Sequence, residues 1–130
     1  MGTVLIVEDN DYNLRLMSYV LKRAGYTVIA ANSGEKGVEM AAGQRPELII
    51  MDINLPGIDG LETTRRIRDF GGRMPIVAIT SRAMTGDRET ILEAGCNGYI
   101  EKPYDPSTVM EQIREFIHKT VTPAGSKEKV

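Results

Sequence analysis

Cysteine is nearly missing from this chain, and the single residue, Cys96, cannot form a disulfide within it. Disulfides are rare in reducing compartments, so one free thiol fits a cytoplasmic protein. Cys96 stands in the stretch Ala94-Gly95-Cys96-Asn97, which is typical of a helix-to-strand turn. We therefore expect a small packed side chain rather than a reactive thiol.

Long hydrophobic runs are missing as well. The longest apolar runs have the length of a strand, well below the roughly 18 residues that a membrane-spanning helix needs. The amino terminus also lacks the basic-then-apolar pattern of a secretory signal. These features lead us to expect a cytoplasmic protein with no membrane partner.

The chain also has no excess of positive charge. The chain has 16 Lys and Arg against 18 Asp and Glu, which gives a formal net charge of −2. Contact along a nucleic acid normally requires a basic face. The basic groups Lys22-Arg23 and Arg65-Arg66 with Arg68 are too scattered to form one, and we expect them on solvated helix faces. The sequence thus predicts no nucleic-acid partner.

What the sequence does contain is a regular alternation of strand-like and helix-like stretches. With 130 residues, 42% of them hydrophobic, the chain has room for one compact domain. The expected strands are Thr3 to Glu8, Tyr26 to Ala31, a run ending at Asp52, a run from Ile76 to Thr80, and Tyr99-Ile100. The first expected helix ends at Gly25, the second opens at Ser33, and the third is capped by Asp59. The fourth runs from Asp87 to Ala94, and the fifth starts at Asp105-Pro106.

Such alternation predicts an α/β protein with a doubly wound parallel sheet of five strands and five helices. We assign residues 1–121 to this domain. The polar residues 122–130 contain Pro, Gly and Lys, and we expect a disordered tail there.

Reactive polar residues follow four of the five expected strands. Glu8-Asp9 follow the first strand, Asp52 ends the third, Thr80 ends the fourth, and Lys102 follows the fifth. The carboxyl ends of parallel strands meet in one crevice, where such folds bind ligands. We therefore expect these side chains to lie together.

The adjacent carboxylates Glu8 and Asp9 indicate a cation. Like charges at the end of a buried strand raise each other's pKa and need compensation. Oxygen ligands without Cys or His nearby favour Mg²⁺ or Mn²⁺ over zinc. Taken alone, the pair could be a solvated acidic loop, but Asp52 on a neighbouring strand argues against that interpretation.

Asp52 ends the strand expected at the centre of the sheet, where a carboxylate serves as nucleophile, metal ligand or both. A carboxylate can attack phosphorus to form an acyl phosphate. A metal and Lys102 would offset the repulsion between the acids and the phosphoryl group, and Thr80 would donate to a phosphoryl oxygen.

Four motifs carry a resemblance to the response-regulator receiver domain of two-component and phosphorelay signalling. They are Val7-Glu8-Asp9-Asn10, the stretch from Met51 to Gly60, Ile79-Thr80, and Gly98-Tyr99-Ile100-Glu101-Lys102-Pro103. They recur in the family's order, and the match spans roughly Thr3 to Lys119. The resemblance implies a flavodoxin-like fold with the strand order 2-1-3-4-5.

By this resemblance, Asp52 accepts a phosphoryl group from a histidine kinase or a histidine phosphotransfer protein. Glu8, Asp9, Asp52 and the backbone carbonyl of Asn54 would hold the metal, and Thr80 and Lys102 would assist the transfer. Such a protein is a signalling phosphoacceptor that catalyses only its own phosphorylation and dephosphorylation.

The resemblance also implies a switch and an output surface. Thr80 and Tyr99 would be the switch pair, although Tyr99 could equally be a core aromatic. The face from Arg82 to Tyr104 would contact a downstream protein, with Met84 and Tyr104 as exposed anchors. Lys102-Pro103 would be a cis peptide, a form that only X-Pro bonds take easily.

Finer features resemble single-domain regulators of the DivK type and the receivers of hybrid kinases. Ser81 stands where the family usually has alanine, and the positions of Asn54 and Arg82 resemble those that tune the phosphate lifetime in the family. No output domain follows the match, so we expect a stand-alone receiver that acts by protein contact or phosphate relay.

Three alternatives to this interpretation remain open on the sequence. A degenerate receiver would bind proteins without being phosphorylated, although every acceptor residue is present here. A haloacid-dehalogenase-type phosphatase would need a second acid at the position of Asn54. A flavodoxin-like flavin carrier would not place Glu8-Asp9 where a phosphate must bind.

Overall fold

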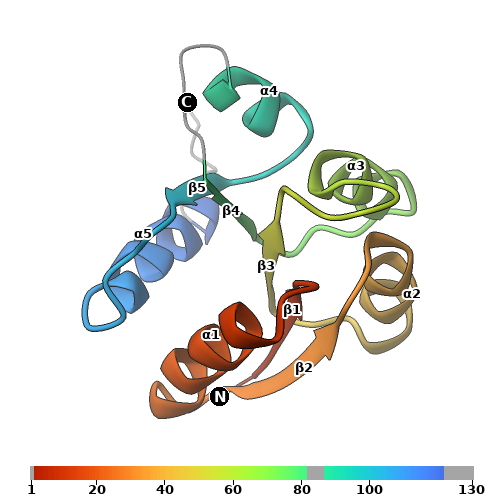
Figure 1. Ribbon diagram of the computed structural model, residues 1–130. Coiled ribbons are helices and arrows are strands. Elements are labelled where there is room, and N and C mark those ends of the chain that lie inside the picture. Colours follow the sequence, from red (N-terminus) through yellow and green to blue (C-terminus); the bar gives the residue numbers. More distant parts are fainter. Residues whose placement is uncertain (1, 82–86, 122–130) are drawn as a thin grey trace.

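The computed structural model describes residues 2–81 and 87–121, with side chains as far as residue 117. Five strands and five helices alternate along the chain (Figure 1). The elements are β1 Thr3–Val7, α1 Asp11–Arg23, β2 Thr27–Ala31, α2 Gly34–Gln44, β3 Leu48–Asp52, α3 Gly60–Asp69, β4 Ile76–Thr80, α4 Asp87–Glu93, β5 Gly98–Glu101 and α5 Val109–Val121. The predicted tail, residues 122–130, lies outside the described residues, as do Arg82 and Met84.

All the strands are parallel, and their order in the sheet is β2-β1-β3-β4-β5. This order confirms the predicted doubly wound fold. β3 is central, and all five of its residues are buried, as expected of a parallel strand that is covered on both faces. The crossovers place α1 and α5 on one face of the sheet and α2, α3 and α4 on the other.

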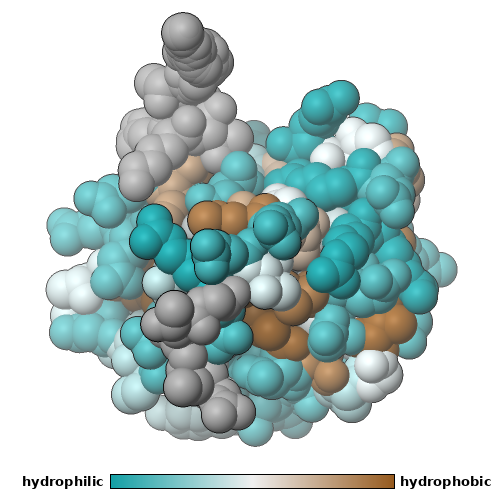
Figure 2. All heavy atoms as spheres, turned by 90° about the horizontal axis from the view of Figure 1, so that it is seen from above, coloured by the Kyte–Doolittle hydropathy of each residue, from teal (hydrophilic) through white to brown (hydrophobic). Residues whose placement is uncertain are grey.

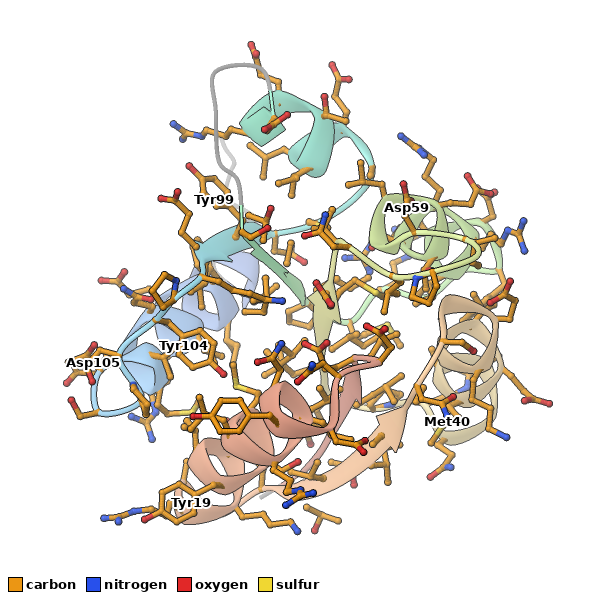
Figure 3. All side chains as sticks on the ribbon, in the orientation of Figure 1. Tyr19, Met40, Asp59, Tyr99, Tyr104 and Asp105 are labelled. Carbon is orange, nitrogen blue, oxygen red and sulfur yellow. The ribbon has the colours of Figure 1, made fainter. Side chains whose placement is uncertain are left out.

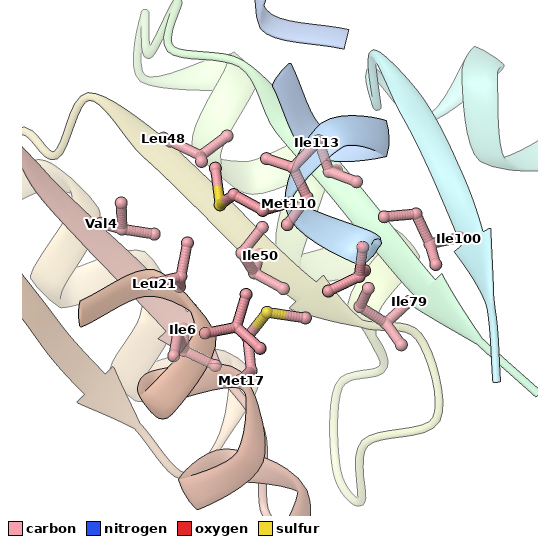
Figure 4. Close-up of a cluster of buried hydrophobic side chains, with 13 residues drawn as sticks. Val4, Ile6, Met17, Leu21, Leu48, Ile50, Ile79, Ile100, Met110 and Ile113 are labelled. Carbon is pink, nitrogen blue, oxygen red and sulfur yellow. The ribbon is translucent and has the colours of Figure 1, made fainter. Parts of the chain in front are cut away.

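Two hydrophobic cores lie on opposite faces of the sheet, because successive strand residues point to opposite sides. Val4 and Ile6 of β1 pack with α1 and α5, whereas Leu5 and Val7 pack with the other helices. Figure 4 shows the first core, in which Ile50 of β3 lies among Met17 of α1 and Met110 of α5. The surface seen from above in Figure 2 is mostly hydrophilic, with only small separate hydrophobic areas.

Capping side chains begin three of the helices. Asn10, Ser33 and Asp59 each accept a hydrogen bond from the backbone N–H three residues further on, at the starts of α1, α2 and α3. The predictions for Ser33 and Asp59 are thereby confirmed. α2 ends at Gln44, and Arg45 adopts the left-handed conformation that closes the helix.

The start of α5 is a correction to the sequence analysis. Asp105-Pro106 predicts a helix from that point, but α5 begins at Val109 and residues 106–108 form a turn. The Asp105 carboxylate accepts hydrogen bonds from the backbone N–H and the hydroxyl of Ser107, at 2.9 and 2.7 Å. The cap therefore stabilises a tight turn ahead of the helix.

Arg68 is a second correction, because its side chain is half-buried rather than on a solvated helix face. The guanidinium donates to the carbonyl oxygens of Gly72, Met74 and Gly95, at distances between 2.7 and 3.1 Å. It also donates to Asn97 Oδ1 at 3.0 Å, and the same oxygen accepts from the N–H of Ile76. Arg68 thus ties the loops before β4 and β5 to α3.

Cys96 is buried and packs in the core beneath α3 and α4, as the sequence predicts. Its Sγ lies 3.7 Å from Thr64 Oγ1. Burial raises the pKa of this thiol, which keeps it in the unreactive protonated form.

Candidate functional site

The candidate site lies at the carboxyl ends of β1, β3, β4 and β5, where the sequence places the reactive residues. Glu8 follows β1, Asp52 ends β3, Thr80 ends β4, and Lys102 follows β5. Carboxylate oxygens of Glu8, Asp9 and Asp52 lie within 4.8 Å of one another. The fold therefore brings the three predicted acids together.

Burying these acids close together disfavours their charged forms. Glu8 and Asp52 are 6% and 3% exposed, whereas Asp9 is exposed. Burial, together with the hydrogen bond and the negative charge of Asp52, raises the pKa of Glu8 to about 7. The Asn10 N–H and the Lys102 ammonium act in the opposite direction. Such a cluster favours a cation between the carboxylates.

Among the described residues, Lys102 is the basic residue that pairs with these acids. Its Nζ lies 3.4 Å from Asp52 Oδ1 and 3.9 Å from Glu8 Oε1, and its side chain is 22% exposed. The peptide bond from Lys102 to Pro103 is cis, as the resemblance implies. Among the described residues, one ammonium faces two buried carboxyl groups and a nearby third, so acidic groups outnumber basic groups at the site.

Backbone N–H groups fix the orientation of both buried acids. The N–H of Asn10 donates to Glu8 Oε2 at 3.2 Å, and the N–H of Asn54 donates to Asp52 Oδ1 at 3.1 Å. Each donor comes two residues after its acceptor, at the point where the chain turns away from the strand. The turn that follows each strand therefore holds its own carboxylate in place.

Thr80 and Tyr99 lie on the same side of the sheet. In β4, Ile76 and Ala78 face α2, α3 and α4, so the alternation of side chains places Thr80 on that side too. Tyr99 packs against the same core from β5 and is half-buried. Thr80 itself is 3% exposed. In Figure 3, Tyr99 lies on the side of β5 near α4.

Ser81 makes a contact that the sequence analysis missed. Its hydroxyl lies 3.4 Å from Asn54 Oδ1 and connects the end of β4 to the loop after β3. An alanine at this position could not donate this hydrogen bond. Only the position of Ser81 beside Thr80 hinted at such a link.

A cavity of about 520 Å³ opens beside the acids, between α1 and the chain that follows β5. Its wall combines Glu8, Asp52 and Lys102 with the side chains of α1 and of the β5–α5 connection. The α1 residues are Tyr12, Asn13, Leu16 and Met17, and the connection contributes Pro103, Tyr104 and Pro106. The sequence analysis did not predict this cavity, because it depends on how α1 packs beside the β5–α5 connection, two segments far apart in the chain.

Tyr104 borders this cavity and is a further correction. The sequence analysis treats it as an exposed anchor, but it is half-buried and packs against the core formed with α1 and α5. Burial raises the pKa of Tyr104 to about 12, and the nearby Glu8 and Tyr12 contribute. Figure 3 shows its ring between the β5–α5 connection and α1.

A second hollow lies on the face predicted to contact a downstream protein. This groove of about 650 Å³ is lined by α4, β5 and α5, including Leu92, Tyr99 and Phe116. Leu92 is 41% exposed there.

Within the described parts of the chain, no helix is long and apolar enough to cross a membrane.

The sequence of this chain matches those of known proteins over most of its length. A family model described as the response regulator receiver domain matches residues 4–114. The chain is 38% identical over 117 residues to the polar-differentiation response regulator DivK of Brucella anthropi. That alignment covers 88% of this chain and 95% of the relative. DivK of Brucella ovis matches with the same identity and coverage.

Solved structures show the same fold. One is the receiver domain of a sensor histidine kinase from Pseudomonas aeruginosa, with a magnesium ion coordinated in its active site cleft. It is 37% identical, has a TM-score of 0.82, and the match covers 91% of this chain and 98% of that one. A CheY-like receiver domain protein from Methanospirillum hungatei gives a TM-score of 0.84 at 27% identity, over 92% of this chain and 96% of that one.

Proposed function

We propose, because this chain belongs to the response regulator receiver domain family, that Asp52 accepts a phosphoryl group from a histidine kinase or a histidine phosphotransfer protein. The observation that carries the proposal is the meeting of three carboxylates within 4.8 Å, with the Lys102 ammonium 3.4 Å from Asp52. Membership of the family removes the phosphatase and flavin-carrier alternatives.

The donor set fits a magnesium ion. Glu8, Asp9 and Asp52 offer hard carboxylate oxygens, and the backbone carbonyl of Asn54 would complete the protein's share of the ligands. Mg²⁺ is bound by a few carboxylates together with water and phosphate oxygens, and Mn²⁺ accepts similar ligands. When bound, the ion would neutralise the acids and draw in the oxygens of the incoming phosphoryl group.

Asp52 would act as the nucleophile in this transfer. A carboxylate oxygen forms a bond to phosphorus while the bond from phosphorus to the donor's imidazole nitrogen breaks, and the bonding electron pair stays on that nitrogen. The N–H of Asn54 holds the Asp52 carboxylate in a fixed orientation, so little reorganisation precedes the attack. The cavity beside Asp52 gives the donor an approach from the side of α1.

Lys102 and Thr80 would stabilise the transferred group. The Lys102 ammonium already lies between Asp52 and Glu8, within reach of a phosphoryl oxygen bonded to Asp52. Thr80 ends the neighbouring strand β4, from which its hydroxyl would donate to a second phosphoryl oxygen. Phosphoryl transfer depends mainly on such positioned charges and donors.

The phosphorylated state would be passed to partner proteins through Thr80 and Tyr99. Both lie on the α4 side of the sheet, and Tyr99 also lines the groove between α4 and α5. A hydrogen bond from Thr80 to the phosphoryl group would vacate space into which the Tyr99 ring turns. A few charge-assisted hydrogen bonds of about 1.5–3 kcal/mol each suffice to shift an existing equilibrium between two states.

The direct test is the intact mass of the protein after incubation with acetyl phosphate and Mg²⁺. Native protein should gain the mass of one phosphoryl group, and Asp52→Asn should gain none. Asp59→Asn is the matched control, because Asp59 is an exposed helix cap whose role asparagine can fill. Unchanged labelling of Asp52→Asn would place the acceptor elsewhere. Native protein that resists every phosphodonor while still binding its partners would support the unphosphorylated binding module instead.

A further inference from the structure

Three glycines lie where the helices on one face of the sheet approach the acid-bearing segments. Gly34 and Gly37 are in the first turn of α2, and Gly60 is the first residue of α3. All three are buried, and none has a positive φ. Backbone conformation therefore does not require glycine at these positions, and the reason must lie in the space around them.

Gly60 lies directly against the end of β3. A methyl group on it would overlap the carbonyl oxygen of Asp52 and lie 2.7 Å from the Cα of Ile53. Its N–H donates to the carbonyl of Ile53 at 3.0 Å. Backbone atoms cannot move aside as a flexible side chain can, so only glycine lets α3 begin this close to Asp52.

Gly34 makes a similar approach to the loop between β3 and α3. A methyl group there would overlap Thr63 Oγ1 and lie 2.6 and 2.9 Å from the Cγ1 and carbonyl oxygen of Ile58. Thr63 is fully buried, and its hydroxyl donates to the Asp59 carbonyl at 2.7 Å. Thr63 is enclosed on all sides, and the carbonyl of Ile58 belongs to the backbone, so neither can easily give way. The first turn of α2 therefore presses on the loop that carries Asn54.

Gly37 extends this contact to the end of β1. A methyl group on Gly37 would lie 2.9 Å from Val7 Cγ2. Val7 is fully buried and immediately precedes Glu8. The first turn of α2 thus contacts Val7, the residue before Glu8, and also the loop that follows Asp52.

The geometry points to Gly34, Gly37 and Gly60 as positioning residues that set Glu8, Asp52 and the Asn54 loop at their mutual distances. This inference rests on the proposed function, in which these groups hold Mg²⁺. A magnesium ion tolerates little departure from octahedral geometry at roughly 2.0–2.1 Å. Displacing one ligand-bearing segment by a few tenths of an ångström would therefore weaken binding, although none of the glycines touches the ion.

The experiment compares alanine variants of the three glycines with Gly43→Ala. Gly43 is in α2 as well, but a methyl group there meets nothing within 4 Å. The control therefore carries the change in helix propensity without the contact. Mg²⁺ affinity is measured by calorimetry at a temperature where circular dichroism shows each variant folded, and amide spectra are recorded without metal.

We expect Gly34→Ala, Gly37→Ala and Gly60→Ala to bind Mg²⁺ about tenfold more weakly or worse, the range seen when residues behind metal ligands are changed. Amide shifts at residues 8–10 and 52–54 should move in the metal-free variants, and Gly43→Ala should match native protein in both respects. Lowered stability with native Mg²⁺ affinity would overturn the inference and leave a merely structural role.

A double variant keeps the inference testable if Gly60→Ala does not fold. Thr63→Ala removes the hydroxyl that a methyl group at Gly34 would overlap, so Gly34→Ala with Thr63→Ala should recover part of the Mg²⁺ affinity lost in Gly34→Ala alone. Failure to recover any of it would count against the positioning role. The proposed function is judged separately, on native protein, because its failure would appear as no phosphorylation of Asp52 at all.

Discussion

Glu8 makes the stability of the metal-free protein depend on pH. Burial and the neighbouring Asp52 raise its pKa from 4.5 to about 7. A carboxyl group whose pKa is higher in the folded than in the unfolded state binds its proton more tightly when folded. The stabilisation from this proton is therefore fully present below pH 4.5 and is lost as the pH rises through about 7.

The size of the effect follows from the shift. Each pKa unit corresponds to about 1.4 kcal/mol, so a rise from 4.5 to about 7 corresponds to about 3 kcal/mol of unfolding free energy. That is a large share of the roughly 5–15 kcal/mol that stabilises a typical domain. Glu8→Gln retains the size of the side chain and an acceptor for the Asn10 N–H, but it cannot ionise.

Glu8→Gln should therefore be more stable than native protein by about 3 kcal/mol at about pH 8 and nearly equal to it at about pH 4. Urea unfolding followed by circular dichroism, in the presence of a chelator, measures both values. Glu39→Gln, an exposed change on α2, serves as the control. Added Mg²⁺ should stabilise native protein far more at the higher pH, where the carboxylates are ionised, and should stabilise Glu8→Gln less. Parallel pH profiles for native protein and Glu8→Gln would refute the reasoning.

Three further predictions concern the groups around the acids and the opposite end of the sheet. Lys102→Met removes the ammonium that lies 3.4 Å from Asp52 and should slow phosphorylation by acetyl phosphate about 100-fold. A time course of intact mass measures the rate, and an unchanged rate would exclude Lys102 from the transfer. Thr80→Ala should still be phosphorylated on Asp52, but the amide shifts that beryllofluoride, a phosphoryl mimic, causes in residues 87–104 of native protein should shrink; equal shifts in both proteins would reject Thr80 as the coupling residue. Arg68→Met removes the donor to three carbonyl oxygens and one of the two donors to Asn97 Oδ1, and it should lower the unfolding free energy by about 3 kcal/mol in urea, against less than about 0.5 kcal/mol for the exposed Arg65→Met. Equal losses would contradict the contacts assigned to Arg68.

The sheet and the acid cluster were predictable because both follow from local patterns. Buried parallel strands correspond to short apolar runs in the sequence, and a residue at the carboxyl end of such a run lies at the ligand-binding edge of the sheet. That argument placed Glu8, Asp52 and Lys102 correctly without any knowledge of distances. The start of α5 was harder, because Asp105 can stabilise either a helix or the turn that it forms with Ser107.

Other features depend on contacts between distant parts of the chain. Arg68 looks like any helix-surface arginine in the sequence, yet its acceptors include Gly95 and Asn97, nearly thirty residues away. The contact of Gly34 with Thr63 and the cavity between α1 and Tyr104 likewise depend on how the helices pack. Single-sequence patterns report on helix faces and strand ends, and they carry little information on such packing.

The strand order also fixes the sequence in which charges reach the site during translation. β1 pairs with β2 and β3, so Glu8 and Asp52 can meet as soon as β3 has left the ribosome. Lys102 follows β5, the last strand to be made, and β5 joins the sheet only through β4. In chain order, both buried acids therefore precede the ammonium that pairs with them. Lys102 thereby links the last strand of the sheet to the acids that end β3 and follow β1, at 3.4 Å from Asp52 and 3.9 Å from Glu8.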